Sequence, residues 1–137
     1  MSKLQKFLNA NPVAGMTKEV VVSDRFRDEE GNLLKFTIRS ISPSEFEEIR
    51  KKALSLKKGG KEIEFDTGKF NMALVINCTV DPNFKDAESI KQLGCATPEQ
   101  YVNKVLLAEE VEELAQQIRA FSGFDKDLDE LVKEAKN

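Results

Sequence analysis

Two short start signals constrain the fold more than any other feature of this sequence. The segments SPSE (42–45) and TPEQ (97–100) each place a hydroxyl residue before a proline and an acid or amide two residues after it. At the start of a helix the hydroxyl accepts a hydrogen bond from a backbone N–H group that has no partner in the helix, and the acid or amide closes a capping box. Proline suits the first helical position because it has no N–H group to leave unpaired. Helices are therefore predicted to begin at Pro43 and Pro98.

Apolar residues at the three- and four-residue spacing of a helix face support these and further helices. The helix after SPSE carries a stripe from Phe46 to Leu56, and the helix after TPEQ carries one from Tyr101 to Leu106. Proline disfavours helical geometry in the residue before it, and glycine accepts the left-handed conformation beyond a helix end. The other predicted helices are one from Thr67 that stops at Asp81-Pro82, a brief one through Ile90 and Leu93 that closes at Gly94, and one with the stripe Val111, Leu114, Ala115 and Ile118 that ends at Gly123.

A β-hairpin is predicted in the N-terminal half of the chain. The segment TKEVVVS is rich in β-branched residues, and in LLKFTIRS the residues Leu34, Phe36 and Ile38 alternate with polar ones, which is the period of a half-buried strand. The turn DEEGN lies between them within a loop longer than two residues.

An amphipathic segment precedes the hairpin. SKLQKFLNA places Leu4, Phe7 and Leu8 at helical spacing, and a proline and a glycine follow it. Residues 1–15 are therefore predicted to be a loosely attached N-terminal helix and linker. The helix either folds onto the domain or waits for a partner.

One domain accounts for the whole chain. A length of 137 residues is enough to bury a sizeable core. Residues 1–137 are predicted to form a single α+β domain, mainly α: a compact helical domain with one N-terminal-half β-hairpin and a C-terminal amphipathic helix over 124–137. The segment KKGGK ends the helix that starts at Pro43, and EIEF (62–65) after it is either a short strand or an extended loop.

No catalytic signature appears in the sequence. The chain has no histidine, which removes the commonest general base and metal ligand and excludes a Ser-His or Cys-His nucleophile pair. Glycine motifs that bind nucleotides are absent, and KKGGKE lacks the strand–loop–helix context of a phosphate loop. Cys78 and Cys95 are predicted to be reduced, structural thiols. The chain is therefore predicted not to be an enzyme and to need no cofactor.

The best candidate for a metal site is DKDLDE. Asp125, Asp127 and Asp129 match the first, third and fifth positions of a calcium loop. Glu130 stands where the loop needs glycine, and Lys136 stands where it needs a bidentate glutamate. The carboxylates suit the first turn of a helix better, because they favour the positive end of its dipole. No metal site is predicted.

Charge and hydropathy exclude two classes of partner. The formal charge is −3 and acids are mixed with lysines, so no basic face is available for the phosphates of a nucleic acid. No apolar run approaches the roughly 20 residues that span a bilayer, so a cytosolic protein without a membrane partner is predicted. The charged loop DRFRDEEGN (24–32) is predicted to be a solvated hairpin tip without shifted pKa values, not a pair of acid–base carboxylates.

Three longer segments carry further information. They are SDRFRDEEGNLLKFTIRSISPSEFEEIRKKA, then VDPNFKDAES, and at the end IRAFSGFDKDLDELVKEAKN. In this order they resemble the XkdN-like tail assembly chaperones of PBSX-type bacteriophages and prophages. The resemblance runs from about Phe7 to Asn137, and the ending is its most specific part. Where family members often have a Gly-Glu pair, this chain has Ala108 and Glu109.

The resemblance implies a small non-enzymatic phage protein made in the host bacterial cytoplasm. Such proteins bind the tape-measure protein, keep its hydrophobic helices soluble, bring tail-tube subunits to it, and are absent from the mature virion. A homo-oligomer is a further expectation. The alternative is a minor structural tail protein that is retained in the virion.

The end of the chain is predicted to bind the partner. Two aromatic residues flank the helix stop at Gly123, and the last helix carries an apolar stripe that suits docking against another helix. The alternative for the two aromatic residues is that they pack the last helix onto its own domain, since glycine stops commonly carry such a contact. The predicted partner-binding residues are Phe121, Phe124, Leu128, Leu131 and Val132.

Overall fold

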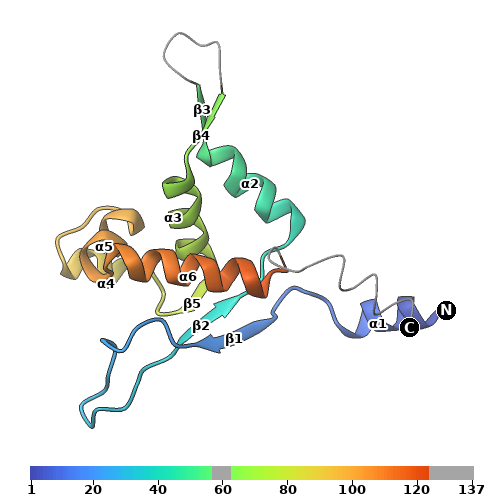
Figure 1. The fold of residues 1–137 in the computed structure, drawn as a ribbon, viewed down its shortest axis with the longest axis horizontal. Helices are drawn as coiled ribbons and strands as arrows, with labels where there is room; N and C mark the ends of the chain where they lie inside the picture. The colour runs from blue at the N-terminus through green and yellow to red at the C-terminus, as the bar shows by residue number, and fades with distance from the viewer. Residues whose placement is uncertain (57–62, 124–137) are drawn as a thin grey trace.

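Six helices and five short strands form the part of the chain that the computed structural model describes, residues 1–56 and 63–123 (Figure 1). The helices are α1 (Lys3–Ala10), α2 (Pro43–Ala53), α3 (Thr67–Cys78), α4 (Ala87–Gln92), α5 (Pro98–Val105) and α6 (Ala108–Phe121). The strands are β1 (Thr17–Val20), β2 (Phe36–Arg39), β3 (Leu54–Leu56), β4 (Ile63–Phe65) and β5 (Thr79–Asp81). The predicted class, α+β and mainly α, is confirmed.

Both hydroxyl residues cap helices as predicted, but the acid and the amide do not close the predicted capping boxes. Glu45 pairs with Arg39 instead, and the Gln100 side chain accepts a hydrogen bond from the N–H of Ala96. The Ser42 hydroxyl accepts a hydrogen bond from the backbone N–H of Glu45 at 3.4 Å, and the Thr97 hydroxyl accepts one from the N–H of Gln100 at 3.2 Å. The prolines that follow open α2 and α5. These bonds satisfy N–H groups that have no partner inside the helix, which is why such short motifs fix where a helix begins.

Glycines end two of the helices, also as predicted. Gly94 follows α4 with a φ of +71°, and Gly123 follows α6 with a φ of +91°. A side chain with a Cβ rarely adopts this left-handed conformation, so glycine is the residue that suits the position. The left-handed backbone at Gly123 therefore marks the end of α6.

The predicted hairpin is part of a three-stranded antiparallel sheet with the order β1-β2-β5. Val20 lies opposite Phe36 in the β1–β2 pair, and Ile38 lies opposite Thr79 in the β2–β5 pair. Strand β5 was not predicted, and the helix that was predicted to stop at Asp81-Pro82 ends at Cys78. The three residues of β5 follow α3 directly, and the proline after them indicated only the end of a helix.

Leu34 does not share the buried face that was predicted for it. Phe36 and Ile38 are buried, but β2 begins at Phe36 and Leu34 is 48% exposed. The cause is pairing within the loop before β2, where the N–H of Leu34 donates to the carbonyl of Phe26 at 2.8 Å. Leu34 therefore belongs to the loop and not to the sheet.

A second hairpin, β3–β4, follows α2. The prediction that Leu56 lies on the stripe of that helix was wrong, because α2 ends at Ala53 and the chain then becomes extended. Leu54 pairs with Phe65 across the hairpin, so the described residues of EIEF, Ile63–Phe65, form a strand. The segment KKGGK that joins the two strands lies outside the described residues.

Helix α3 is central to the core and packs against α2 and α6. It is apolar on several sides, as expected of a helix inside a domain, with Phe70, Leu74, Val75, Ile76 and Cys78 buried. Full burial of one such side chain contributes roughly 1.5–3 kcal/mol. The other buried apolar residues are Val20, Phe36, Ile38, Ile41, Ile49, Ala53, Phe84, Val102, Leu106, Leu114, Ala115 and Ile118.

Candidate partner-binding surfaces

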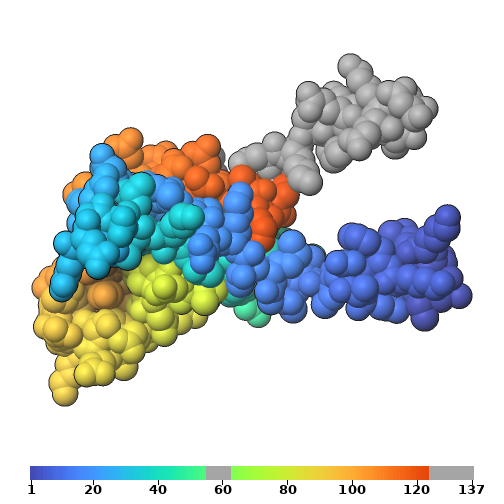
Figure 2. All heavy atoms as spheres, turned by 90° about the horizontal axis from the view of Figure 1, so that it is seen from below, coloured from blue at the N-terminus to red at the C-terminus, as the bar shows by residue number. Residues whose placement is uncertain are grey.

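The N-terminal segment holds α1 away from the rest of the described chain. All residues from 1 to 19 are exposed, and α1 extends to one side of the molecule in two perpendicular views (Figures 1 and 2). The base of the segment is attached to the sheet, because the N–H of Ser40 donates to the carbonyl of Met16 and its hydroxyl donates to the carbonyl of Val13, both at 3.2 Å. Residues 1–16 are called the arm below.

The arm carries an exposed apolar stripe. Leu4, Phe7 and Leu8 lie on one face of α1 and are 67%, 60% and 53% exposed. A surface helix of a globular domain normally turns such a stripe toward the core, yet α1 buries none of its residues. Exposed apolar side chains gathered in this way mark sites of protein–protein contact, so the arm is a candidate partner-binding surface.

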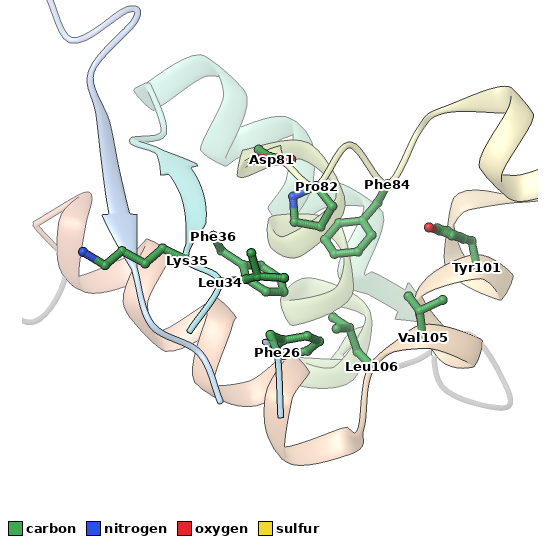
Figure 3. Close-up of a pocket in the computed structure, with 10 residues that line it drawn as sticks. All are labelled: Phe26, Leu34, Lys35, Phe36, Asp81, Pro82, Phe84, Tyr101, Val105 and Leu106. Carbon is green, nitrogen blue, oxygen red and sulfur yellow. The ribbon is translucent and has the colours of Figure 1, made fainter. Parts of the chain in front are cut away.

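An apolar groove of about 390 Å³ is a second candidate surface (Figure 3). Its deepest residues, Phe36, Phe84 and Leu106, are buried. Its full lining is Phe26, Leu34, Lys35, Phe36, Asp81, Pro82, Phe84, Tyr101, Val105 and Leu106. Because eight of these ten residues are apolar or aromatic, the groove suits an apolar side chain from a partner.

Four separate stretches of the chain build this groove. The long loop between β1 and β2 contributes Phe26 and Leu34, and β2 begins at its edge. The chain after β5 contributes Phe84, and α5 with its C-cap residue contributes the opposite wall. Edge-on ring contacts fix the loop, since the Phe26 and Phe36 ring centroids are 4.9 Å apart at 62°. The sequence analysis did not predict the groove, because no single segment contains its pattern.

An ion pair fixes the loop between β1 and β2 to α6. Arg25 donates from Nη2 to Oε1 of Glu110 at 2.6 Å and from Nε to Oε2 at 3.0 Å, and Nη2 also reaches the carbonyl of Val105 at 2.9 Å. The guanidinium lies 4.6 Å from the centroid of the Phe26 ring. The prediction of a solvated tip without shifted pKa values was therefore wrong at Arg25, because the bonds to Glu110, which lies far away in the sequence, raise the pKa of its guanidinium.

The carboxylate of Glu110 serves two elements at once. It accepts a hydrogen bond from the backbone N–H of Leu107 at 2.8 Å, which caps the start of α6. It also accepts the two hydrogen bonds from the guanidinium of Arg25. The side chain is only 5% exposed. Hydrogen bonds from Arg25, together with the N–H of Leu107, lower the pKa of Glu110 to about 2. Within the loop, backbone N–H groups, that of Asn32 foremost, also lower the pKa of Asp28.

The predicted surface at the chain end falls mostly outside the described residues. Phe124, Leu128, Leu131 and Val132 lie there, as does the DKDLDE segment that was weighed as a metal site. Phe121 is described: it is partly buried and packs against the core. This placement agrees with a role in holding the end of α6 on the domain, and partner binding by the five residues stays a prediction.

The end of α6 is also attached through a polar contact. The hydroxyl of Ser122, the residue after the helix, accepts a hydrogen bond from the N–H of Ile41 at 3.1 Å. Ile41 lies between β2 and α2, so this bond joins the last described helix to the middle of the fold. The end of α6 is therefore held to the domain at Ser122.

Potential metal ligands do not cluster in the described part of the chain, and its buried cysteine is protonated. Across 1–56 and 63–123, no group of three or more His, Cys, Asp or Glu side chains could hold a metal ion. Burial raises the pKa of the Cys78 thiol to about 11, so it is protonated at neutral pH and a poor nucleophile. In the same residues, no helix has the length and apolar character to cross a membrane.

Comparison with known proteins assigns the family. The family model for phage XkdN-like tail assembly chaperone proteins matches residues 4–136. YqbN of Bacillus subtilis strain 168, described as uncharacterized, is 30% identical over 138 residues, which cover 98% of this chain and 93% of YqbN. The phage-like element PBSX protein XkdN of the same strain is 27% identical with the same coverage.

A solved structure supports the fold. The crystal structure of YqbN matches this structure with a TM-score of 0.71 at 24% identity, covering 91% of this chain and 99% of that chain. Because the family model spans nearly the whole sequence, the resemblance seen in the three segments is confirmed. This chain belongs to the family of phage XkdN-like tail assembly chaperone proteins.

Proposed function

We propose that this chain binds the tape-measure protein of its phage, keeps the hydrophobic helices of that protein soluble, and brings tail-tube subunits to it. The work takes place in the host bacterial cytoplasm, and the chain leaves before the virion matures. Membership of the tail assembly chaperone family supports a role in assembly. A chaperone of this kind stabilises a partner by binding it in its unassembled state, which needs apolar surface and no catalytic group.

The observation that carries this proposal is the way α6 ends. Phe121 still packs on the core, and Gly123 with its φ of +91° stops the helix immediately afterwards. The helix predicted over 124–137 is therefore proposed to be separate from α6. Its predicted stripe, which includes Leu128 and Leu131, is proposed to lie along an apolar face of a tape-measure helix.

Co-expression with the tape-measure protein of the same tail gene cluster tests the proposal. We expect the tape-measure protein to become soluble and to elute with this chain as one complex in size-exclusion chromatography. Leu128→Asp combined with Leu131→Asp is expected to abolish the complex, because two charges then face the partner. Lys133→Asp is the matched control, since it adds an acid to the same segment outside the stripe.

Two outcomes would count against the proposal. A tape-measure protein that stays insoluble beside the wild-type chain contradicts solubilisation by this protein. Mass spectrometry of purified virions tests the second point, departure before maturation. Retention at a stoichiometric copy number would favour the alternative of a minor structural tail protein.

A further inference from the structure

We propose that the arm of one copy of this protein binds the groove of a second copy, so that copies associate head to tail. Phe7 is the central anchor and fills the groove between Leu34 and Val105. This inference is independent of tape-measure binding, because self-association is measured with the protein alone.

The arm has the features of a ligand. Its apolar stripe is fully formed on a capped helix, since Ser2 accepts a hydrogen bond from the N–H of Gln5 at 2.9 Å. An isolated helix of eight residues is marginal in water, so α1 gains from packing against another surface. An aromatic anchor flanked by two leucines is the pattern by which helices bind grooves.

The groove has the features of a matching receptor. Its volume of about 390 Å³ falls within the roughly 300–1,000 Å³ of typical ligand pockets and accommodates an aromatic side chain with part of its helix. Figure 3 shows Leu34 and Val105 on opposite sides of the space, with Phe84 and Pro82 above Phe26. The ion pair of Arg25 holds the loop in place, so the groove exists before a partner arrives.

The positions of the two surfaces indicate whether the arm binds the groove of its own chain or that of a second copy. The arm joins the sheet at the Thr17 end of β1, whereas the groove lies at the other end of the hairpin, beside Phe36. In both views α1 extends from one side of the molecule and the loop and α5 lie at the opposite side (Figures 1 and 2). Two different patches that face apart give a heterologous contact, which propagates into a ring or a helical row of copies.

Charge favours the same occupant. The arm contains two lysines and no acid, whereas the rest of the chain has 19 basic and 24 acidic residues, a formal charge of −5. An arm with net positive charge is therefore attracted to the remainder of another copy. At the groove itself Lys35 and Asp81 are the charged lining residues, so the local contribution is small and apolar contact dominates the affinity.

Sedimentation and light scattering of the purified full chain against concentration form the first test. Standard interfaces use about 20–30 residues on each side, so an arm of 16 residues gives a weaker, reversible contact. We expect the average mass to rise above the monomer value of 15.4 kDa as concentration increases into the micromolar range. A wild-type chain that stays monomeric up to several hundred micromolar overturns the proposal.

Complementation of two variants forms the decisive test. Phe7→Asp prevents binding by the arm and leaves the groove intact. Leu34→Asp prevents binding by the groove and leaves the arm intact. Each variant alone is expected to be monomeric, and a mixture is expected to form a complex of two chains and no larger species. Ile63→Asp, at a residue 67% exposed on β4 and away from both surfaces, is the matched control and should associate like the wild type.

Other results would identify a different interface. If Phe7→Asp prevents association but Leu34→Asp does not, arms bind arms and the groove is not the receptor. If the wild type is monomeric and Phe7→Asp instead weakens the tape-measure complex, the arm binds that partner. Either result overturns the head-to-tail proposal, and the circular dichroism spectrum of each variant shows that its fold is intact.

Discussion

The segments on the two sides of β1 differ in how they are attached to the domain. The loop after β1 carries seven charged residues, yet it is held by the ion pair of Arg25 with Glu110 and by the ring contact of Phe26. The arm before β1 carries a helix with an apolar stripe, yet all residues of the arm are exposed. Composition alone would predict the reverse. The difference shows that a segment is fixed by the partners the fold brings to it, and here α6 provides them only to the loop.

Among the changes that test how the loop is attached, removing the Glu110 carboxylate should reduce stability the most. Glu110→Ala leaves Arg25 and the start of α6 without their acceptor, and we expect the free energy of unfolding to fall by about 2 kcal/mol, the loss being moderated because Arg25 is half exposed. Urea denaturation measures this change. Glu109→Ala, one residue earlier and exposed, is the control and should change little. Equal stability of the two variants would mean that the ion pair does not hold the loop.

Acid should weaken the same attachment in a defined pH range. The pKa of Glu110 is about 2 in the folded chain and 4.5 without its partners, so its stabilisation is complete above about pH 4.5 and is lost as the pH falls toward 2. We expect the stability difference between wild type and Glu110→Gln to be constant from pH 7 to 5 and to shrink below that. Comparing the two proteins cancels the contributions of Glu45 and Asp86, whose pKa values are also lowered.

A difference that persists unchanged at pH 3 would contradict this assignment. Each measurement uses the urea midpoint of both proteins in the same buffer. The sign follows from the acid being charged in the fold: protons bind the unfolded chain more readily, so lower pH favours unfolding.

Local signals in the sequence predicted the parts of the fold that local contacts determine. Ser42 and Thr97 cap helices through bonds that span three residues, so SPSE and TPEQ could be interpreted without knowing the rest of the fold. Gly123 ends α6 through its own backbone conformation. The class, the starts of α2 and α5 and the ends of α4 and α6 followed from such signals, whereas α2 and α3 end earlier than predicted.

Long-range contacts could not be predicted in the same way. Glu110 lies 85 residues from Arg25, so nothing in the loop indicated that one of its charges is paired. Strand β5 exists because β2 pairs with it, and its three residues have no pattern of their own. The one available hint for Glu110 was its place directly before the predicted stripe that begins at Val111, since acids in the first turn of a helix often cap its start.

The two candidate surfaces differ in the same way: one lies within a single segment and the other is built by long-range contacts. The stripe of Leu4, Phe7 and Leu8 was visible in the sequence because it repeats within one helix. The groove was not visible, because Leu34 was assigned to a buried strand face and the other walls come from three more stretches of chain. Of the five predicted partner-binding residues, the structure describes Phe121, and its position on the core follows from the helix that carries it.

Amide hydrogen exchange at low protein concentration should be slower in the loop between β1 and β2 than in the arm. The loop amides of Leu34 and Asp28 donate to carbonyls at 2.8 and 2.9 Å, so we expect them to exchange slowly. The amides of α1 should exchange within seconds in a dilute monomer, because a short exposed helix opens readily. At high concentration the head-to-tail contact should slow α1 alone. Slow exchange of α1 that does not depend on concentration would mean that the arm is held within its own chain.

The smallest effect is expected from the arm itself. Phe7→Asp changes an aromatic residue that is 60% exposed and outside the buried core, so the free energy of unfolding of the dilute monomer should change by less than about 0.5 kcal/mol. A buried phenylalanine replaced in the same way, such as Phe36 in the groove floor, should instead cost several kcal/mol. Thermal unfolding of the two variants measures the contrast. If Phe7→Asp destabilises the monomer as Phe36→Asp does, the arm belongs to the core of its own domain and is not a free ligand for another copy.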